Sequence, residues 1–204
     1  MEHILTGWDH LLFVISLLLL VGINRRLVGT ITAFTVAHSL TLAGSALGWL
    51  TLRAAPVEAT IALSIMLVCS EALHQRETLS RRWPALVALL FGLVHGLGFA
   101  GALKEIGLPE EHAAMALLTF NLGVEAGQML VVLGCWALAT VWSRSMTSAR
   151  TQTAASAFGS ADGPDLTPAP ALNKNRATRA LVYAIGAMGA YWTISRVIAI
   201  VFGS

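Results

Sequence analysis

Apolar residues occur along this chain in six long runs, separated for the most part by short polar connections. Each run is close to the roughly 20 residues that a helix needs to cross the hydrocarbon core of a bilayer. The pattern therefore predicts an all-α fold, a polytopic membrane helix bundle of about six transmembrane helices that forms a single integral membrane domain over residues 1–204. The expected spans are 7–24, 27–50, 56–74, 84–103, 114–142 and 179–202.

The long connection between the last two runs, residues 143–178, has a different composition. It is rich in Ser, Thr, Ala, Gly, Asp and Pro and carries no motif. Such low-complexity polar segments bury too little apolar surface to fold alone. We therefore expect a disordered loop on the cytoplasmic side.

Composition supports a membrane protein and changes little else. The chain is 56% hydrophobic and 12% charged, whereas soluble domains carry about 25% charged residues. The formal net charge of +2 says little about partners, because it is spread over connections. We expect no nucleic-acid partner. The lipid bilayer is the expected partner of the apolar faces, and a second copy of the chain or a metalloenzyme-maturation protein is a candidate partner.

Basic residues are concentrated in three connections, which follow the first, third and fifth runs. The opposite side of the predicted bundle has only Arg53 and Lys104. The positive-inside rule then places both termini outside, and the expected location is the bacterial inner membrane, as a multi-pass protein. The residues that set this orientation are Arg25, Arg26, Arg76, Arg81, Arg82, Arg144, Arg150, Lys174, Arg176 and Arg179.

Candidate metal ligands stand at the start of the first run, where His3, Asp9 and His10 precede a leucine-rich segment. A carboxylate that enters hydrocarbon is costly without a partner, so Asp9 is a functional-site candidate. Aspartate and histidine together are typical ligands of divalent metals.

Four further ionisable residues fall at comparable depth. From a helix rise of about 1.5 Å per residue, His38 and His95 lie roughly 16 Å above the inner boundary, and Glu58 and Glu125 lie roughly 25 Å above it. The Asp-His pair of the first run falls between these levels. The predicted metal ligands are His3, Asp9, His10, His38, Glu58, His95 and Glu125.

Other interpretations of these residues stay open. A buried histidine is often only a hydrogen-bonded polar residue, and a membrane glutamate is often an interhelical partner. If the carboxylates converge, either a metal or protons must neutralise them. The glycines around His38 and His95 are most simply explained by close helix packing.

A short internal repeat involves both histidines. Residues 34–44 align with 91–101, and each is followed in the next run by the tripeptide Val-Glu-Ala, at 57–59 and 124–126. This predicts two parallel repeats, a pattern found in transporters, although chance similarity also explains so short a match.

Several motifs resemble those of a known membrane family. The residues His3, Gly7, Asp9 and His10 resemble the first-helix HPxxGxDH signature of the HupE/UreJ family, whose members are associated with hydrogenase and urease. Residues 57–64 (VEATIALS) are similar to its GVExxIAxS helix, and residues 91–96 (FGLVHG) resemble its FHG segment. The order of motifs is most similar to the second HupE/UreJ subgroup.

The resemblance implies a permease for a divalent transition metal, nickel or cobalt, with zinc also compatible with imidazole ligands. This chain departs from the nickel-permease pattern, because Ile4 replaces the proline after His3, and Phe99 and Ala102 stand where a second histidine and a glutamate are expected. His38 and Glu125 are candidates to replace those ligands. We expect no enzyme activity; the alternatives are an intramembrane metallohydrolase using Ser39 or an accessory subunit in metalloenzyme maturation.

Overall fold

The computed structural model describes residues 7–74, 78–106, 113–157 and 174–203, with side chains described in 7–74, 78–98, 114–141 and 176–203. All regular elements in these ranges are helices, so the predicted all-α fold is confirmed. The helices are α2 (Trp8–Val21), α3 (Arg25–Ala46), α4 (Ala54–Leu73), α5 (Leu79–Arg82), α6 (Pro84–Ile106), α7 (Ala113–Ala157) and α8 (Lys174–Phe202).

Four helices in the described part of the chain are long and apolar enough to cross a membrane. They are α3, α4, the part of α7 over Ala114–Val141 and the part of α8 over Arg176–Phe202. Helix α2 and the Pro84–Gly98 part of α6 are also apolar but shorter. The described part of the chain is therefore all-helical, with helices typical of a membrane protein, and six spans with both termini outside stay a prediction.

The expected loop over residues 143–178 is wrong at both ends. Helix α7 continues to Ala157, and α8 begins at Lys174. Residues 143–157 contain no Gly or Pro, and extending an existing helix costs less than nucleating a new one. Residues 158–173 lie outside the described ranges.

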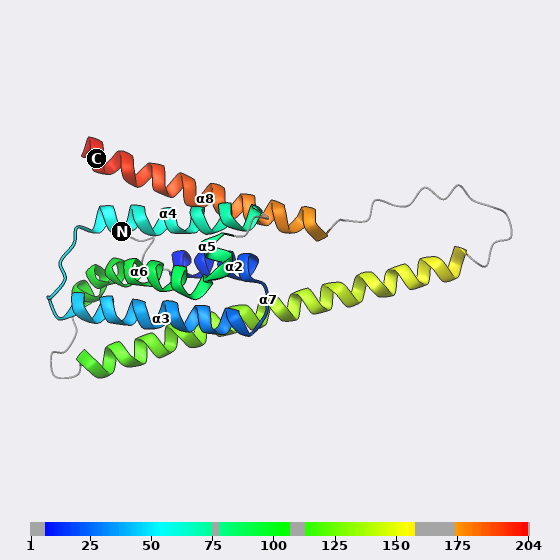
Figure 1. Cartoon of the computed structure of the whole chain (residues 1–204), viewed down its shortest axis with the longest axis horizontal. Helices are drawn as coiled ribbons and strands as arrows, with labels where there is room; N and C mark the ends of the chain where they lie inside the picture. Colours follow the sequence, from blue (N-terminus) through cyan, green and yellow to red (C-terminus); the bar gives the residue numbers. More distant parts are fainter. Residues whose placement is uncertain (1–6, 75–77, 107–112, 158–173, 204) are drawn as a thin grey trace.

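The helices lie roughly side by side, with α8 and α4 at one edge and α3 and α7 at the other (Figure 1). Helix α2 contacts α3, α4, α7 and α8, and its side chains are buried around most of its circumference. A helix that is apolar all round belongs inside a bundle. Phe13 and Leu17 of α2 are almost completely buried and form the centre of the core with residues of its neighbours.

Helices α3 and α6 approach each other closely because α6 carries two glycines one turn apart. A Cβ on Gly92 would overlap the carbonyl oxygen of Phe34, and one on Gly96 would overlap that of His38. Such small-xxx-small spacing lets two backbones touch within a membrane. The contact also sets how near His95, which lies between the glycines, comes to α3.

Helix α8 packs on α4 and contributes an ion pair. Gly186 and Gly189 of α8 face the α4 backbone and side chains at close range. Near the end of the contact, Arg196 Nε lies 2.7 Å from Glu58 Oε2, and both side chains are 19% exposed. This pair neutralises a carboxylate that would otherwise face an apolar environment.

We expect Arg196→Gln to lower the free energy of unfolding by about 2 kcal/mol, because it leaves Glu58 charged and unpaired. The double variant Glu58→Gln/Arg196→Gln should recover most of that loss, since no charge is then left alone. Denaturant unfolding in detergent measures both, with the exposed Arg53→Gln as the control. Equal losses in the single and double variants would contradict the role of the ion pair.

Candidate functional site

Three histidines from three helices meet in the middle of the bundle. His10 lies in the first turn of α2, and His38 and His95 lie in the central parts of α3 and α6. The ring centroids of His10 and His38 are 5.2 Å apart, and those of His10 and His95 are 5.3 Å apart. His38 and His95 are 0% exposed. We refer to these three residues as the histidine cluster.

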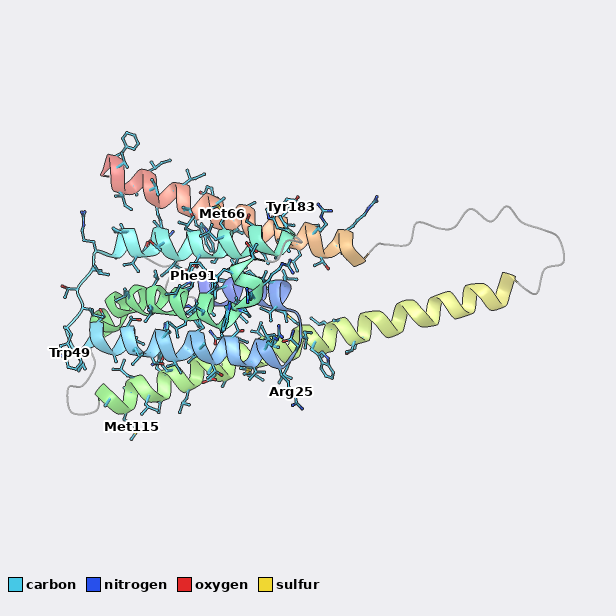
Figure 2. All side chains as sticks on the ribbon, viewed as in Figure 1. Arg25, Trp49, Met66, Phe91, Met115 and Tyr183 are labelled. Carbon is cyan, nitrogen blue, oxygen red and sulfur yellow. The ribbon has the colours of Figure 1, made fainter. Side chains whose placement is uncertain are left out.

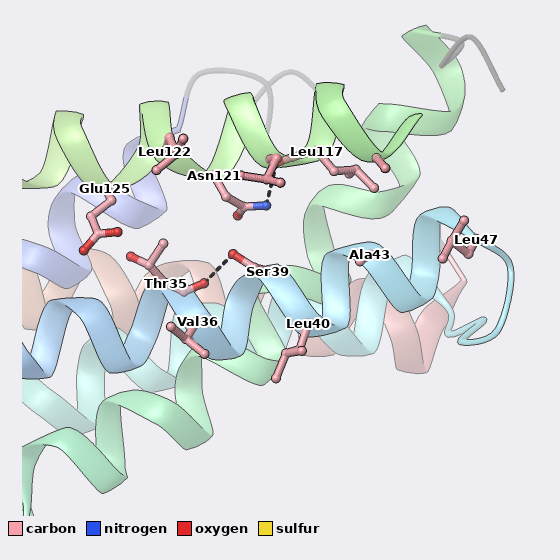
Figure 3. Close-up of a pocket in the computed structure, with 12 residues that line it drawn as sticks. Thr35, Val36, Ser39, Leu40, Ala43, Leu47, Leu117, Asn121, Leu122 and Glu125 are labelled. Carbon is pink, nitrogen blue, oxygen red and sulfur yellow. Dashed lines mark hydrogen bonds between the residues drawn. The ribbon is translucent and has the colours of Figure 1, made fainter. Parts of the chain in front are cut away.

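The hydrogen bonds of Asn121 determine which nitrogen of His38 carries the proton. Asn121 Nδ2 donates to the carbonyl oxygen of Leu117 over 2.8 Å, which leaves Oδ1 as the acceptor (Figure 3). His38 Nδ1 lies 3.1 Å from that oxygen and therefore donates. A neutral imidazole has one N–H, so His38 Nε2 keeps a free lone pair. It lies 3.3 Å from His10 Nε2, which donates to it.

In the same way, Ser64 determines which ring nitrogen of His95 carries the proton. Its hydroxyl donates to the carbonyl oxygen of Ile61 over 2.6 Å, so the oxygen accepts from His95 Nε2 at 3.0 Å. The lone pair of a neutral His95 is then on Nδ1. This atom is buried and has no hydrogen-bond partner in the described part of the structure. A buried polar atom without a partner is rare, and a ligand would satisfy it.

The cluster has the chemistry of a transition-metal site. Two neutral imidazoles offer lone pairs, and each is oriented through its other nitrogen by a side-chain oxygen, as metal-binding histidines usually are. In this arrangement, however, no group of three or more His, Cys, Asp or Glu residues among the described side chains surrounds a single metal position. Metal binding would require His10 to turn away from His38 and give up their hydrogen bond.

A phenylalanine lies one helical turn from each histidine, always towards the end of the bundle where α2 ends and α3 and α6 begin. The rings of Phe13 and Phe34 are 4.9 Å apart, and those of Phe13 and Phe91 are 5.8 Å apart. Phe13 also lies 4.9 Å from the His95 ring. We refer to these three residues as the phenylalanine layer; Figure 2 shows Phe91 within the bundle, between α4 and α3. It closes one side of the histidine cluster with apolar rings.

The predicted ligands outside the cluster have different surroundings. Glu58 forms the ion pair with Arg196, and Glu125 Oε1 accepts a hydrogen bond from Thr32 over 2.9 Å. Asp9 is buried in the first turn of α2, next to His10 in the chain. His3 lies outside the described residues. The structure thus brings three of the seven predicted ligands into ring contact and places the two glutamates in separate environments.

Sequence reasoning missed the side chains that support the histidines. Ser64 lies in one of the family-like motifs, but the sequence gives it no role of its own, and the phenylalanine layer was also missed. A signal was present, because an aromatic residue stands three positions after His10 and four positions before His38 and His95. Since α2 runs antiparallel to α3 and α6, these spacings place all three rings on the same side.

The serine next to His38 has no catalytic partner in this arrangement. Ser39 Oγ donates to the carbonyl oxygen of Thr35 over 2.7 Å, whereas His38 is bonded to Asn121 and His10. A hydrolytic serine needs a base within hydrogen-bond reach of its hydroxyl. The geometry therefore does not favour the Ser39 hydrolase hypothesis.

The supporting contacts cross between the two predicted repeats. His38 of the first repeat is bonded to Asn121 of the second, and His95 of the second is bonded to Ser64 of the first. Helix α3 contacts α7, and α4 contacts α6 in the corresponding way. These crossed hydrogen bonds agree with two related units, each of which places one histidine next to His10 of α2.

Comparison with known protein families identifies the chain. Residues 1–196 match the family described as HupE / UreJ protein. The chain belongs to the HupE/UreJ family. No curated protein and no solved structure matches the chain at a significant level. The family membership predicted from the motifs is confirmed, and it suggests a membrane metal-transport or accessory role.

The HupE/UreJ-like motifs supply two of the three histidines of the cluster and part of its support. The first-helix signature contributes His10, the helix with the VEATIALS sequence contributes Ser64, and the FGLVHG segment contributes His95 together with Phe91. The motifs are far apart in the sequence, yet their side chains meet at one depth in the bundle.

Proposed function

We propose that this HupE/UreJ protein is a multi-pass permease of the bacterial inner membrane for a divalent transition metal, with nickel and cobalt as the first candidates. The observation that carries this proposal is the histidine cluster: three imidazoles from three helices, of which His38 and His95 are fully buried and oriented by Asn121 and Ser64. Imidazole suits nickel, cobalt and zinc, and outer-shell oxygens of this kind support such ligands.

The metal would enter from the end of the bundle where α2 begins. His3 and Asp9 would capture it, and His10, His38 and His95 would bind it after partial loss of its water. The basic residues at the opposite end, which include Arg25 and Arg81, favour a cytoplasmic location for that end. In this orientation we propose uptake, from the outside to the inside.

The phenylalanine layer would separate the cluster from the cytoplasmic end. A hydrated ion gains nothing from three packed phenyl rings, and apolar constrictions of this kind gate pores by excluding water. The arrangement therefore corresponds to a state that is closed on the inner side. Release would require Phe13, Phe34 and Phe91 to move apart.

Metal flux into sealed proteoliposomes tests the proposal. We expect vesicles that contain the protein and an internal metal-sensing dye to take up nickel or cobalt with saturable kinetics, and a second metal to compete. Protein-free vesicles measure the leak. Uptake no faster than that leak, with metal still bound stoichiometrically to the purified protein, would instead favour the accessory or catalytic hypothesis.

A further inference from the structure

Gln128 of α7 is a buried polar residue outside the histidine cluster. Its side chain is 4% exposed. One end of its amide lies 3.2 Å from the Thr35 hydroxyl of α3, and the atom at the other end has no hydrogen-bond partner in the described part of the chain. A buried amide with one end unsatisfied costs free energy, and a polar ligand would remove that cost.

The Thr35 hydroxyl decides which end of the amide is unsatisfied. Thr35 Oγ1 lies 3.2 Å from the carbonyl oxygen of Ile31, one turn back in α3, and 3.2 Å from the Gln128 amide. The hydroxyl has one proton, and the two ends of an amide have the same shape, so the hydrogen bonds decide how the amide is turned. If Thr35 donates to Ile31 and accepts from the Gln128 N–H, two bonds form instead of one. The unsatisfied atom is then the carbonyl oxygen of Gln128, an acceptor.

The other predicted repeat indicates that helix packing does not require this pair. When the repeat alignment is extended by two residues, Ile61 of α4 corresponds to Gln128, and Gly92 of α6 corresponds to Thr35. Ile61 is also 4% exposed, and Gly92 lies against the backbone of α3. An apolar side chain therefore fills the equivalent place, so the buried amide needs a reason other than packing.

The amide lies beside the phenylalanine layer. Thr35 directly follows Phe34 and precedes His38 by three residues, so it lies roughly 4.5 Å nearer the start of α3. Figure 3 shows Thr35 on the side of α3 that faces α7. Asn121, which is bonded to His38, and Gln128 are seven residues apart, or about two turns, and so share one face of α7. This face leads from the histidine cluster to the level of the phenyl rings.

An uncharged acceptor at this level suits a hydrated divalent metal. The water molecules bound to the ion are hydrogen-bond donors, and a carbonyl oxygen accepts from them. Such a contact holds nickel or cobalt less tightly than direct ligation by imidazole does. A transport path needs sites that are favourable enough to enter and weak enough to leave. The phenyl rings offer no such contact, whereas the amide beside them does.

We propose that Gln128 is a transport residue, whose amide oxygen accepts hydrogen bonds from the water molecules of the metal as the ion leaves the histidine cluster and passes the phenylalanine layer. Thr35 is the positioning residue, because it holds the amide nitrogen and so directs the oxygen. This inference rests on the proposed function and names the contact that follows the histidines on the way inward.

Uptake kinetics of Gln128→Leu in proteoliposomes, with nickel as the metal, test this role. We expect the maximal rate per folded protein to fall about 10-fold, the lower end of the loss caused by removing an outer-shell partner. The nickel concentration for half-maximal uptake and the binding of nickel to the purified protein should stay within about two-fold, because the histidines are intact. The variant should unfold at the same or a higher denaturant concentration, since it removes an unsatisfied buried group. Leu130→Met, at an exposed position of the same helix, is the control.

A second pair of variants tests the positioning by Thr35. Thr35→Ser keeps the hydroxyl and should retain more of the maximal rate than Thr35→Val, which removes it. A wild-type maximal rate in Gln128→Leu would overturn the inference, and so would a fall in rate that only matches a loss of folded protein or of nickel binding. If the wild type itself shows no saturable uptake, the proposed function fails and this inference fails with it. Normal uptake by both wild type and Gln128→Leu would remove the role of Gln128 alone.

Discussion

Gly96→Val is expected to lower the free energy of unfolding by more than about 3 kcal/mol, at the upper end of the cost of overpacking a core. The reason is that the new side chain meets backbone rather than a movable side chain. Already a Cβ at this position would overlap the carbonyl oxygen of His38 and the Thr41 hydroxyl. Helices α3 and α6 would have to separate along their contact.

The measurement is denaturant unfolding in detergent, with the elution profile as a check on the folded fraction. Gly127→Ala is the matched control, because Gly127 also lies within a membrane helix but a Cβ added there would meet no described neighbour within 4 Å. We expect the control to be neutral or slightly stabilising, since alanine favours helix more than glycine does. If Gly96→Val is as stable as this control, the close approach of the two helices is wrong.

Two properties of the site were predictable from the sequence: the depth of the histidines and the close contact between their helices. Helix rise alone placed His38 and His95 at the same level, because each lies eleven residues after the start of its run. The glycines beside His95 indicated close packing, and Gly92 and Gly96 do contact α3. Depth and helix contact are local properties, so a single helix carries enough information to predict them.

The surroundings of the two glutamates were not predictable in this way. Glu58 and Glu125 stand in identical tripeptides, yet one is paired with Arg196 of the last helix and the other with Thr32 of α3. Which partner a side chain meets depends on the order of helices around the bundle, and periodicity does not determine that order. The continuation of α7 to Ala157 differs from the predicted loop for another reason: a polar composition favours a loop, but residues 143–157 contain no helix-breaking residue.

The histidine cluster also shows that tautomers can be derived only once the fold is known. The sequence placed three imidazoles at similar depth, but it gave no information on which nitrogen is free. Ser64 and Asn121 decide this, and each lies on a helix of the other predicted repeat. Nδ1 of His95 is then the atom that points most directly to a ligand, because a purely structural role would leave this buried nitrogen without a hydrogen-bond partner.

Removing that nitrogen is expected to abolish transport. We predict that His95→Ala lowers the initial rate of saturable metal uptake into proteoliposomes more than about 100-fold. Loss of an outer-shell partner alone typically costs roughly 10-fold to 100-fold in metal affinity or activity, and loss of a ligand should cost more. Ser64→Ala, which removes only the orienting hydroxyl, should therefore fall between His95→Ala and the wild type.

A second substitution separates metal binding from folding. In His95→Gln the side-chain amide nitrogen can still reach Ser64, in place of the Nε2 contact of 3.0 Å, but no lone pair remains where Nδ1 was. We expect this variant to unfold at a denaturant concentration close to that of the wild type and yet to transport no metal above the leak. Because Leu138 is exposed on α7, far along the helix from Asn121, Leu138→Ala should transport at the wild-type rate. Wild-type uptake by His95→Gln would show that His95 holds the helices together without binding the ion, and the permease route would then have to avoid the histidine cluster.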